Sequence, residues 1–138
     1  TISERHHQPY GVVHGGVYAS IIETLASVGA GVRAFALNKT VLGLENHTSF
    51  LRAVRQGRLR ARGTPLSRGR RSQVWEVAIQ DDSGALVATG RVRLLLLDPE
   101  AQVAGTTLGF AKTPAASTGS AATTDSTARG DQGKGETP

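Results

Sequence analysis

The sequence has 138 residues, which suits a single domain, and its 38% hydrophobic content is enough for a modest core. It contains no cysteine, which excludes disulfides, thiolate metal sites and a cysteine nucleophile and leaves the cytosol as the default compartment. The net charge is +5, and eight arginines with no acidic residue lie between Arg52 and Arg71. Such a basic cluster attracts phosphate groups on a nucleotide, a nucleic acid or a membrane surface.

The first ordered element is predicted to be a helix from Gly15 to Leu37. Apolar residues lie nearly all round it, which is typical of a buried helix rather than one laid on a surface. Its longest apolar run, 17–32, is too short for a membrane span and carries Glu23 in its middle. No signal-peptide pattern precedes it, so we expect a soluble protein with no membrane partner.

Four strands are predicted after the helix, over residues 41–51, 57–65, 72–80 and 85–97. Trp75, Val77 and Ile79 recur at every second position, and Arg58, Arg60 and Arg62 alternate in the same way with small or apolar residues. The turn-forming residues 81–84 join the last two strands, as an antiparallel hairpin requires. The predicted class is α+β, with an antiparallel sheet wrapped round one long helix in a domain over 1–98.

The composition changes at the C-terminal end. Residues 99–138 are rich in Ala, Thr, Ser and Gly, which predicts a disordered low-complexity tail. At the other end the chain begins without Met, so we expect the numbering to start inside a longer protein or after processing.

Glu23 is the most informative residue, because a carboxylate in an apolar helix loses hydration unless it is hydrogen-bonded, ion-paired or facing a cleft. At the helical period, Gly16, Ser20, Glu23 and Ser27 form one polar stripe. A cleft along this stripe would explain why polar residues lie on an otherwise apolar helix. The alternative is a structural glutamate paired with Arg33 or with an arginine of the sheet.

The tripeptide His14-Gly15-Gly16 stands where the helix begins. Two glycines there let a ligand approach unpaired backbone N–H groups, and a helix N-terminus stabilises a developing oxyanion. A histidine before a helix is more often a cap or a packed side chain than a catalyst, so this motif alone is weak.

The segment 7–18, HQPYGVVHGGVY, followed by Glu23 and the pair Ala26-Ser27, resembles the active-site segment of PaaI-type hotdog thioesterases. Residues 46–52, NHTSFLR, and the later Gly57 resemble the next strand in the 4-hydroxybenzoyl-CoA thioesterase branch that carries a glutamate on the helix. The resemblance runs from about Gln8 to Leu97. It implies a hotdog fold and the hydrolysis of an acyl-CoA thioester, with no metal or redox cofactor.

The resemblance also implies roles for individual residues. Glu23 would be the nucleophile or the general base toward the thioester. The Gly15 N–H would hold the thioester oxygen, and Gln8 would assist it or orient water. His14 would shape the loop, and Ser27 would position water or only pack.

Coenzyme A carries phosphates that favour guanidinium partners. By resemblance, Arg52 approaches the nucleotide, and the loop with Arg70, Arg71 and Ser72 faces coenzyme A. Asn46 and His47 resemble positions near the acyl pocket or the subunit boundary. For Arg58, Arg60 and Arg62, a solvated strand face is the better interpretation.

The departure from the family is at the start, because hotdog thioesterases have a helix and one or two strands before this loop. Either the sequence is incomplete there, or a partner covers the exposed sheet edge. The resemblance implies a homodimer or homotetramer that completes each site across an interface.

The alternative function is a non-catalytic acyl-CoA binding or sensor module of the same fold. Nucleic-acid binding ranks third, because the interleaved aromatic residues of a single-strand platform are missing.

Overall fold

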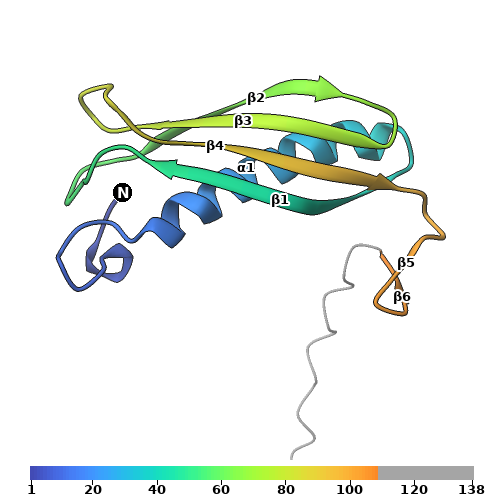
Figure 1. Ribbon diagram of the computed structural model, residues 1–138, viewed down its shortest axis with the longest axis horizontal. Coiled ribbons are helices and arrows are strands. Elements are labelled where there is room, and N and C mark those ends of the chain that lie inside the picture. Colours follow the sequence, from blue (N-terminus) through green and yellow to red (C-terminus); the bar gives the residue numbers. More distant parts are fainter. Residues whose placement is uncertain (109–138) are drawn as a thin grey trace, which may run out of the picture.

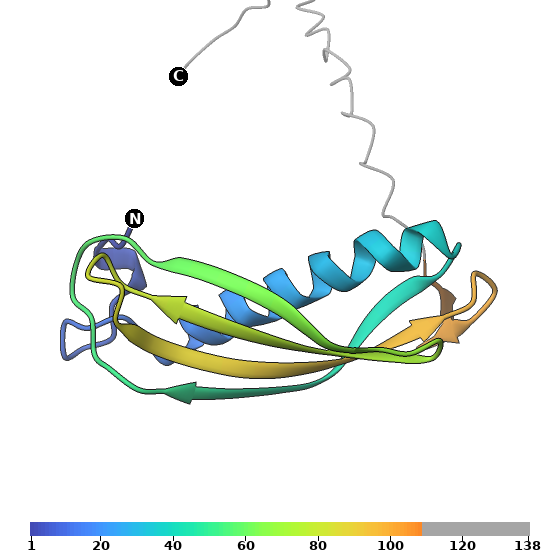
Figure 2. The same cartoon turned by 90° about the horizontal axis from the view of Figure 1, so that it is seen from above.

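The computed structural model describes residues 1–108, in which one long helix lies along one face of an antiparallel sheet (Figures 1 and 2). A short 3-10 turn, η1 (Glu4–His6), precedes the helix α1 (Gly15–Ala36). The strands are β1 (Thr40–Phe50), β2 (Arg60–Arg68), β3 (Ser72–Gln80), β4 (Leu86–Leu97), β5 (Gln102–Val103) and β6 (Thr106–Thr107). The predicted α+β class and the helix wrapped by a sheet are confirmed.

The main sheet has the order β1-β4-β3-β2, with every neighbouring pair antiparallel. β1 and β2 are therefore its two edges. Within residues 1–108, β5 and β6 pair only with each other. This small hairpin lies inside the segment predicted as a tail from residue 99, and residues 109–138 of that predicted tail lie outside the described part of the chain.

The core forms between one stripe of α1 and the inner face of the sheet. The stripe consists of Tyr18, Ile22, Ala26, Ala30 and Ala34, spaced four residues apart. Every second residue of β3 and β4 packs against it, including Val77, Ile79, Val92 and Leu94. Small alanines along the stripe let the helix approach the sheet closely.

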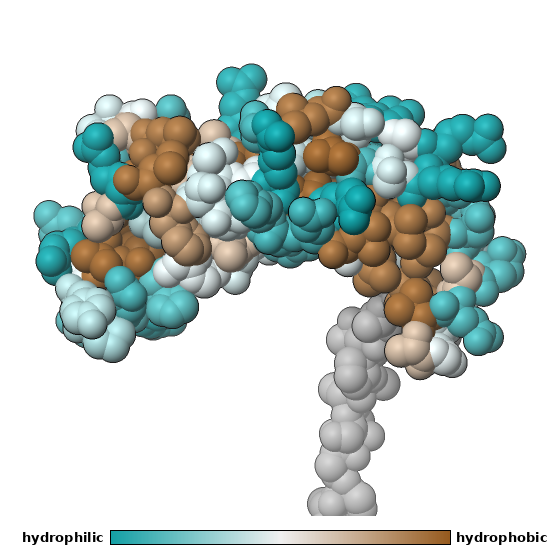
Figure 3. All heavy atoms as spheres, in the orientation of Figure 1, coloured by the Kyte–Doolittle hydropathy of each residue, from teal (hydrophilic) through white to brown (hydrophobic). Residues whose placement is uncertain are grey.

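The expectation of a helix buried on all sides is wrong for this chain taken alone. Val28, Val32 and Phe35 are 59%, 73% and 75% exposed, because the four-stranded sheet covers only one face of α1. Separate apolar patches are also visible between hydrophilic side chains on the face drawn in Figure 3. Apolar surface of this kind marks places where another molecule can pack.

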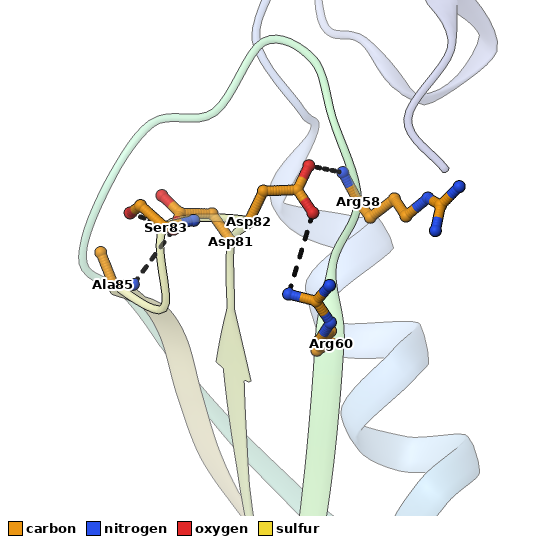
Figure 4. A network of polar contacts seen from close by, with 6 residues as sticks. All are labelled: Arg58, Arg60, Asp81, Asp82, Ser83 and Ala85. Atoms are coloured by element: carbon orange, nitrogen blue, oxygen red, sulfur yellow. Dashed lines mark hydrogen bonds and ion pairs between the residues drawn. The ribbon is translucent and has the colours of Figure 1, made fainter.

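β2 begins three residues later than predicted because of contacts in the preceding loop. Gly57 has a φ of +96°, a conformation that suits glycine. The Arg58 N–H donates to Asp82 Oδ2 at 2.8 Å, and Arg60 lies 3.9 Å from the other carboxylate oxygen (Figure 4). Asp82 thus ties the loop before β2 to the β3–β4 turn.

Candidate active site

Glu23 lies on α1, half-buried, with its carboxylate directed toward β1. Asn46 Nδ2 donates to Oε2 at 2.9 Å, and Ser27 Oγ donates to Oε1 at 3.4 Å. Gly43 lies against the same carboxylate, because a Cβ at that position would come within 2.5 Å of Oε1. Three groups from α1 and β1 therefore surround the Glu23 carboxylate.

Glu23 forms no ion pair within residues 1–108. The described residues therefore do not contain the alternative arrangement, in which Glu23 is a structural residue paired with Arg33 or with an arginine of the sheet. Its hydrogen-bond partners are neutral donors, so the carboxylate charge is not neutralised by a neighbouring side chain. A carboxylate in this setting is available for chemistry.

The start of α1 forms a second polar centre. His14 precedes the helix, and its Nδ1 accepts from the Gly16 N–H at 2.9 Å. His14 thus acts as a helix cap, which agrees with the structural interpretation of this residue. The Gly15 N–H donates to no described residue, so it remains one of the free donors of the helix N-terminus.

A pocket of about 490 Å³ opens at this end of the helix. Its lining includes Gln8, His14, Gly15 and Arg52, together with the aromatic residues Tyr18 and Phe50. The Phe50 ring covers Gly15, where a Cβ would meet ring atoms at 2.7 Å. Burial raises the pKa of Tyr18, so its hydroxyl stays protonated in the pocket wall.

Within one copy of the chain, the two centres do not meet. Gly15 and Glu23 lie eight residues apart on one helix, a rise of about 12 Å along its axis. Glu23 does not line the pocket at Gly15. Gly15 and Glu23 of one copy therefore do not line one common pocket at this end of the helix.

The arginines expected to contact coenzyme A lie at opposite ends of the helix. Arg52 lines the pocket at the start of α1. Arg70 and Arg71 line a separate pocket of about 390 Å³ together with Lys39, just beyond the end of α1. Ser72 begins β3 beside them and is exposed.

Asp98 belongs to this second pocket. Its hydrogen bond from Lys39, at 2.7 Å, is the main cause that lowers the pKa of the Asp98 carboxyl, followed by the charges of Lys39 and Arg71. This acidic group offsets part of the positive charge around Arg71.

The predicted binding residues Asn46 and His47 point to opposite faces of β1, as neighbours on a strand do. Asn46 pairs with buried Val92 and faces the helix, whereas His47 pairs with exposed Arg91 on the outer face. Of these two residues, Asn46 is the one that contacts Glu23. His47 lies on the face of the sheet away from Glu23.

The sequence analysis missed Gly43, Thr48 and Phe50. A glycine inside a strand pattern is a signal for a bulge or a close approach, and the register of β1 shifts between Gly43 and Glu45. Thr48 and Phe50 carried no comparable signal, because their contacts depend on how β1 crosses the helix.

Residues 10–88 match the thioesterase superfamily. The protein Rv1847 of Mycobacterium tuberculosis is 43% identical over 90 residues, which are 64% of this chain and 64% of Rv1847. Its solved structure aligns with a TM-score of 0.69 and 41% identity, covering 70% of this chain and 78% of that one. The chain thus spans slightly less than two thirds of this relative's length.

Two further relatives have names that state an activity. The proofreading thioesterase EntH of Cronobacter sakazakii is 41% identical over 96 residues, 70% of this chain and 69% of EntH. The 1,4-dihydroxy-2-naphthoyl-CoA hydrolase of Escherichia coli is 35% identical over 96 residues, 70% of each protein.

Proposed function

Because this chain belongs to the thioesterase superfamily, whose hotdog fold it shares, we propose that it hydrolyses acyl-CoA thioesters to a free acid and coenzyme A. The observation that carries the proposal is Glu23, a half-buried carboxylate held by neutral donors and free of any ion pair within residues 1–108. The names of EntH and of the E. coli hydrolase support a thioester substrate. The PaaI type is the subfamily that we propose.

Glu23 acts on the thioester in one of two ways. As a general base, it takes a proton from water while the water oxygen bonds to the carbonyl carbon. As a nucleophile, it bonds to that carbon itself, and water then cleaves the resulting anhydride. In both routes the carbon–sulfur bond breaks and the thiolate of coenzyme A takes a proton.

The free Gly15 N–H is suited to hold the carbonyl oxygen as negative charge develops on it. Gln8 lies in the same pocket and assists this contact or orients water. Since Glu23 does not line the pocket that contains Gly15 and Gln8 of the same copy, we infer that the site takes Glu23 from a second copy. We therefore propose a homodimer or homotetramer in which each active site combines two chains.

Two features support this assembly. β1 is an edge strand of the sheet that residues 1–108 form, so within this part of the chain its outer backbone groups are free to pair with another strand. The exposed apolar residues Val28, Val32 and Phe35 on α1 offer a surface that a second copy can cover.

Coenzyme A is the proposed partner, and its phosphates suit the guanidinium groups of Arg52, Arg70 and Arg71. Ser72 is exposed beside the Arg70–Arg71 loop and can add a hydroxyl contact. A cytoplasmic location agrees with a substrate of this kind.

The test is a panel of acyl-CoA esters, with release of the free thiol measured for the wild type and for Glu23→Gln. This substitution keeps the size and hydrogen-bonding reach of the side chain and removes its charge. Turnover should fall by roughly a hundred- to ten-thousand-fold while acyl-CoA binding is retained. Equal turnover in both proteins would remove Glu23 from the mechanism. Binding without turnover in the wild type would favour the sensor alternative.

A further inference from the structure

Asn46 makes the shortest hydrogen bond to the Glu23 carboxylate. It lies on the inner face of β1, opposite the fully buried Val92. Its Nδ2 is 2.9 Å from Glu23 Oε2 and 3.1 Å from the carbonyl oxygen of Ala19. One amide group thus links the carboxylate to the backbone of the same helix, one turn earlier.

The orientation of this amide is determined by its neighbours. Thr48 Oγ1 donates to Asn46 Oδ1 at 2.7 Å. If the amide were reversed, Oδ1 would face the Glu23 carboxylate and the Ala19 carbonyl, both of which only accept hydrogen bonds. The contacts with Thr48 and with the Ala19 carbonyl therefore fix the amide so that Asn46 donates to Glu23.

The two oxygens of the Glu23 carboxylate have different surroundings. Oε2 is held by Asn46 at 2.9 Å, whereas the one hydrogen bond that the described residues make to Oε1 is the longer 3.4 Å contact from Ser27. Oε1 also lies against Gly43, where there is no side chain. Oε1 is thus the less restrained of the two oxygens.

We propose that Asn46, oriented by Thr48, is a positioning residue that holds Oε2 of Glu23 so that Oε1 is the oxygen that acts on the thioester or on water. This inference rests on the proposed thioesterase function. It changes the interpretation of Asn46 from an acyl-pocket or coenzyme A contact to a residue that acts through Glu23. A misplaced carboxylate lowers the rate of the chemical step more than it affects substrate binding.

The first test measures kcat and KM for Asn46→Ala and Thr48→Val on an acyl-CoA ester that the wild type hydrolyses. Asn46→Ala should lower kcat by about ten- to a hundred-fold with KM changed less than about two-fold. Thr48→Val should have a smaller effect in the same direction. Ser49→Ala, on the opposite face of β1, is the matched control and should keep wild-type kcat.

The second test uses Asn46→Asp, which has the same shape and places a carboxylic acid beside Glu23. Two carboxyl groups this close share one proton under acidic conditions, and that proton replaces the amide hydrogen. Activity should therefore be retained in acid and fall as pH rises and the shared proton is lost. Thermal unfolding at each pH separates this effect from a loss of folded protein.

The outcomes distinguish this inference from the proposed function. Unchanged kcat in Asn46→Ala would overturn the inference, and so would a pH profile of Asn46→Asp that superimposes on that of the wild type. In either case Glu23→Gln would still test the proposed function separately. A rise in KM at constant kcat in Asn46→Ala would return Asn46 to a substrate contact and also overturn it. If no acyl-CoA ester were hydrolysed by the wild type, both would fall together.

Discussion

At the scale of single residues, the environment of Glu23 depends on a glycine, Gly43, as much as on the hydrogen-bond donors to the carboxylate. Gly43 approaches the carboxylate so closely that a Cβ would come within 2.5 Å of Oε1. The strand shifts register directly after it, between Gly43 and Glu45. A glycine in a strand costs some stability, and here it makes room for the group that we propose to be catalytic.

We predict that Gly43→Ala lowers kcat by about ten- to a hundred-fold, because the added methyl displaces the carboxylate from its working position. The contacted atom is at the end of a flexible side chain, so folding should be little affected. Steady-state kinetics and thermal unfolding measure the two effects. Ser49→Ala, on the opposite face of β1, is again the control. Wild-type kcat in Gly43→Ala would show that the carboxylate tolerates displacement.

At the scale of elements, α1 depends on one glycine to pack against β3. The Trp75 ring lies where a Cβ on Gly29 would be, at 2.5 Å. Trp75 is held there by a hydrogen bond from its Nε1 to Gln73 Oε1 at 2.9 Å. Gly29 lowers the helix propensity of the sequence, yet the contact requires it.

Two glycine substitutions on the same helix should therefore have opposite effects. Gly29→Ala should destabilise the fold by about 1–3 kcal/mol through overpacking against Trp75. Gly31→Ala should stabilise it by about 0.5–1 kcal/mol, because alanine is the better helix former and nothing obstructs it. Chemical denaturation followed by the fluorescence of the single tryptophan measures both. A stabilising Gly29→Ala would mean that the indole ring can move aside at little cost.

The β3–β4 turn carries a pH-sensitive contact. The hydrogen bond from the Ser83 side chain, at 2.6 Å, is the main cause that lowers the pKa of Asp81. The backbone N–H groups of Ser83 and Ala85 and the charge of Arg52 act in the same direction. Because the folded state lowers this pKa, the contact stabilises the fold above the unfolded value and is lost as pH falls through the folded one.

We expect Asp81→Asn to have a lower Tm than the wild type near neutral pH, and the difference should shrink below about pH 4 as the wild-type carboxyl takes up its proton. Tm measured across this range checks the sign. The control is Glu100→Gln, an exposed carboxylate that makes no hydrogen bond or ion pair within residues 1–108. A difference in Tm that did not change with pH would contradict this account.

At the scale of the whole molecule, one copy holds two halves of two different sites. Gly15 with its pocket lies at the start of α1, and Glu23 lies about 12 Å further along the same helix. If two copies combine these halves, a chain with a defect in one half should be complemented by a partner in which that half is intact.

Gly15→Pro disables the first half, because it removes the N–H and its ring displaces Phe50, whose ring atoms lie 2.7 Å from a Cβ at this position. Proline is tolerated at the first position of a helix, and thermal unfolding checks that the variant is folded. His14, with φ −66° and ψ 137°, already has the conformation that precedes proline. We predict that Gly15→Pro and Glu23→Gln are each inactive alone. Refolded together in equal amounts, they should recover about one quarter of wild-type activity, since half of the dimers then contain one intact site. A mixture no more active than its parents would contradict a shared site.

The sequence by itself determined the elements and the most important side chain. The helix bounds were predicted to within one residue, because His14-Gly15-Gly16 marks the start and the apolar run is continuous. Period-two alternation located β3, and turn residues 81–84 located the hairpin. Glu23 stood out because a carboxylate in an apolar helix is costly unless it has a function or a partner.

The tertiary structure decided which residues meet. Asn46 contacts Glu23 across 23 positions of chain, and neither composition nor periodicity indicates which strand residue faces the middle of a helix. The structure also shows that Glu23 does not line the pocket that contains Gly15. Arg52 and Arg71 are near in sequence, yet β2 runs the length of the sheet between them and carries them to opposite ends of α1. Such relations arise from how the strands cross the helix, and local patterns do not encode that geometry.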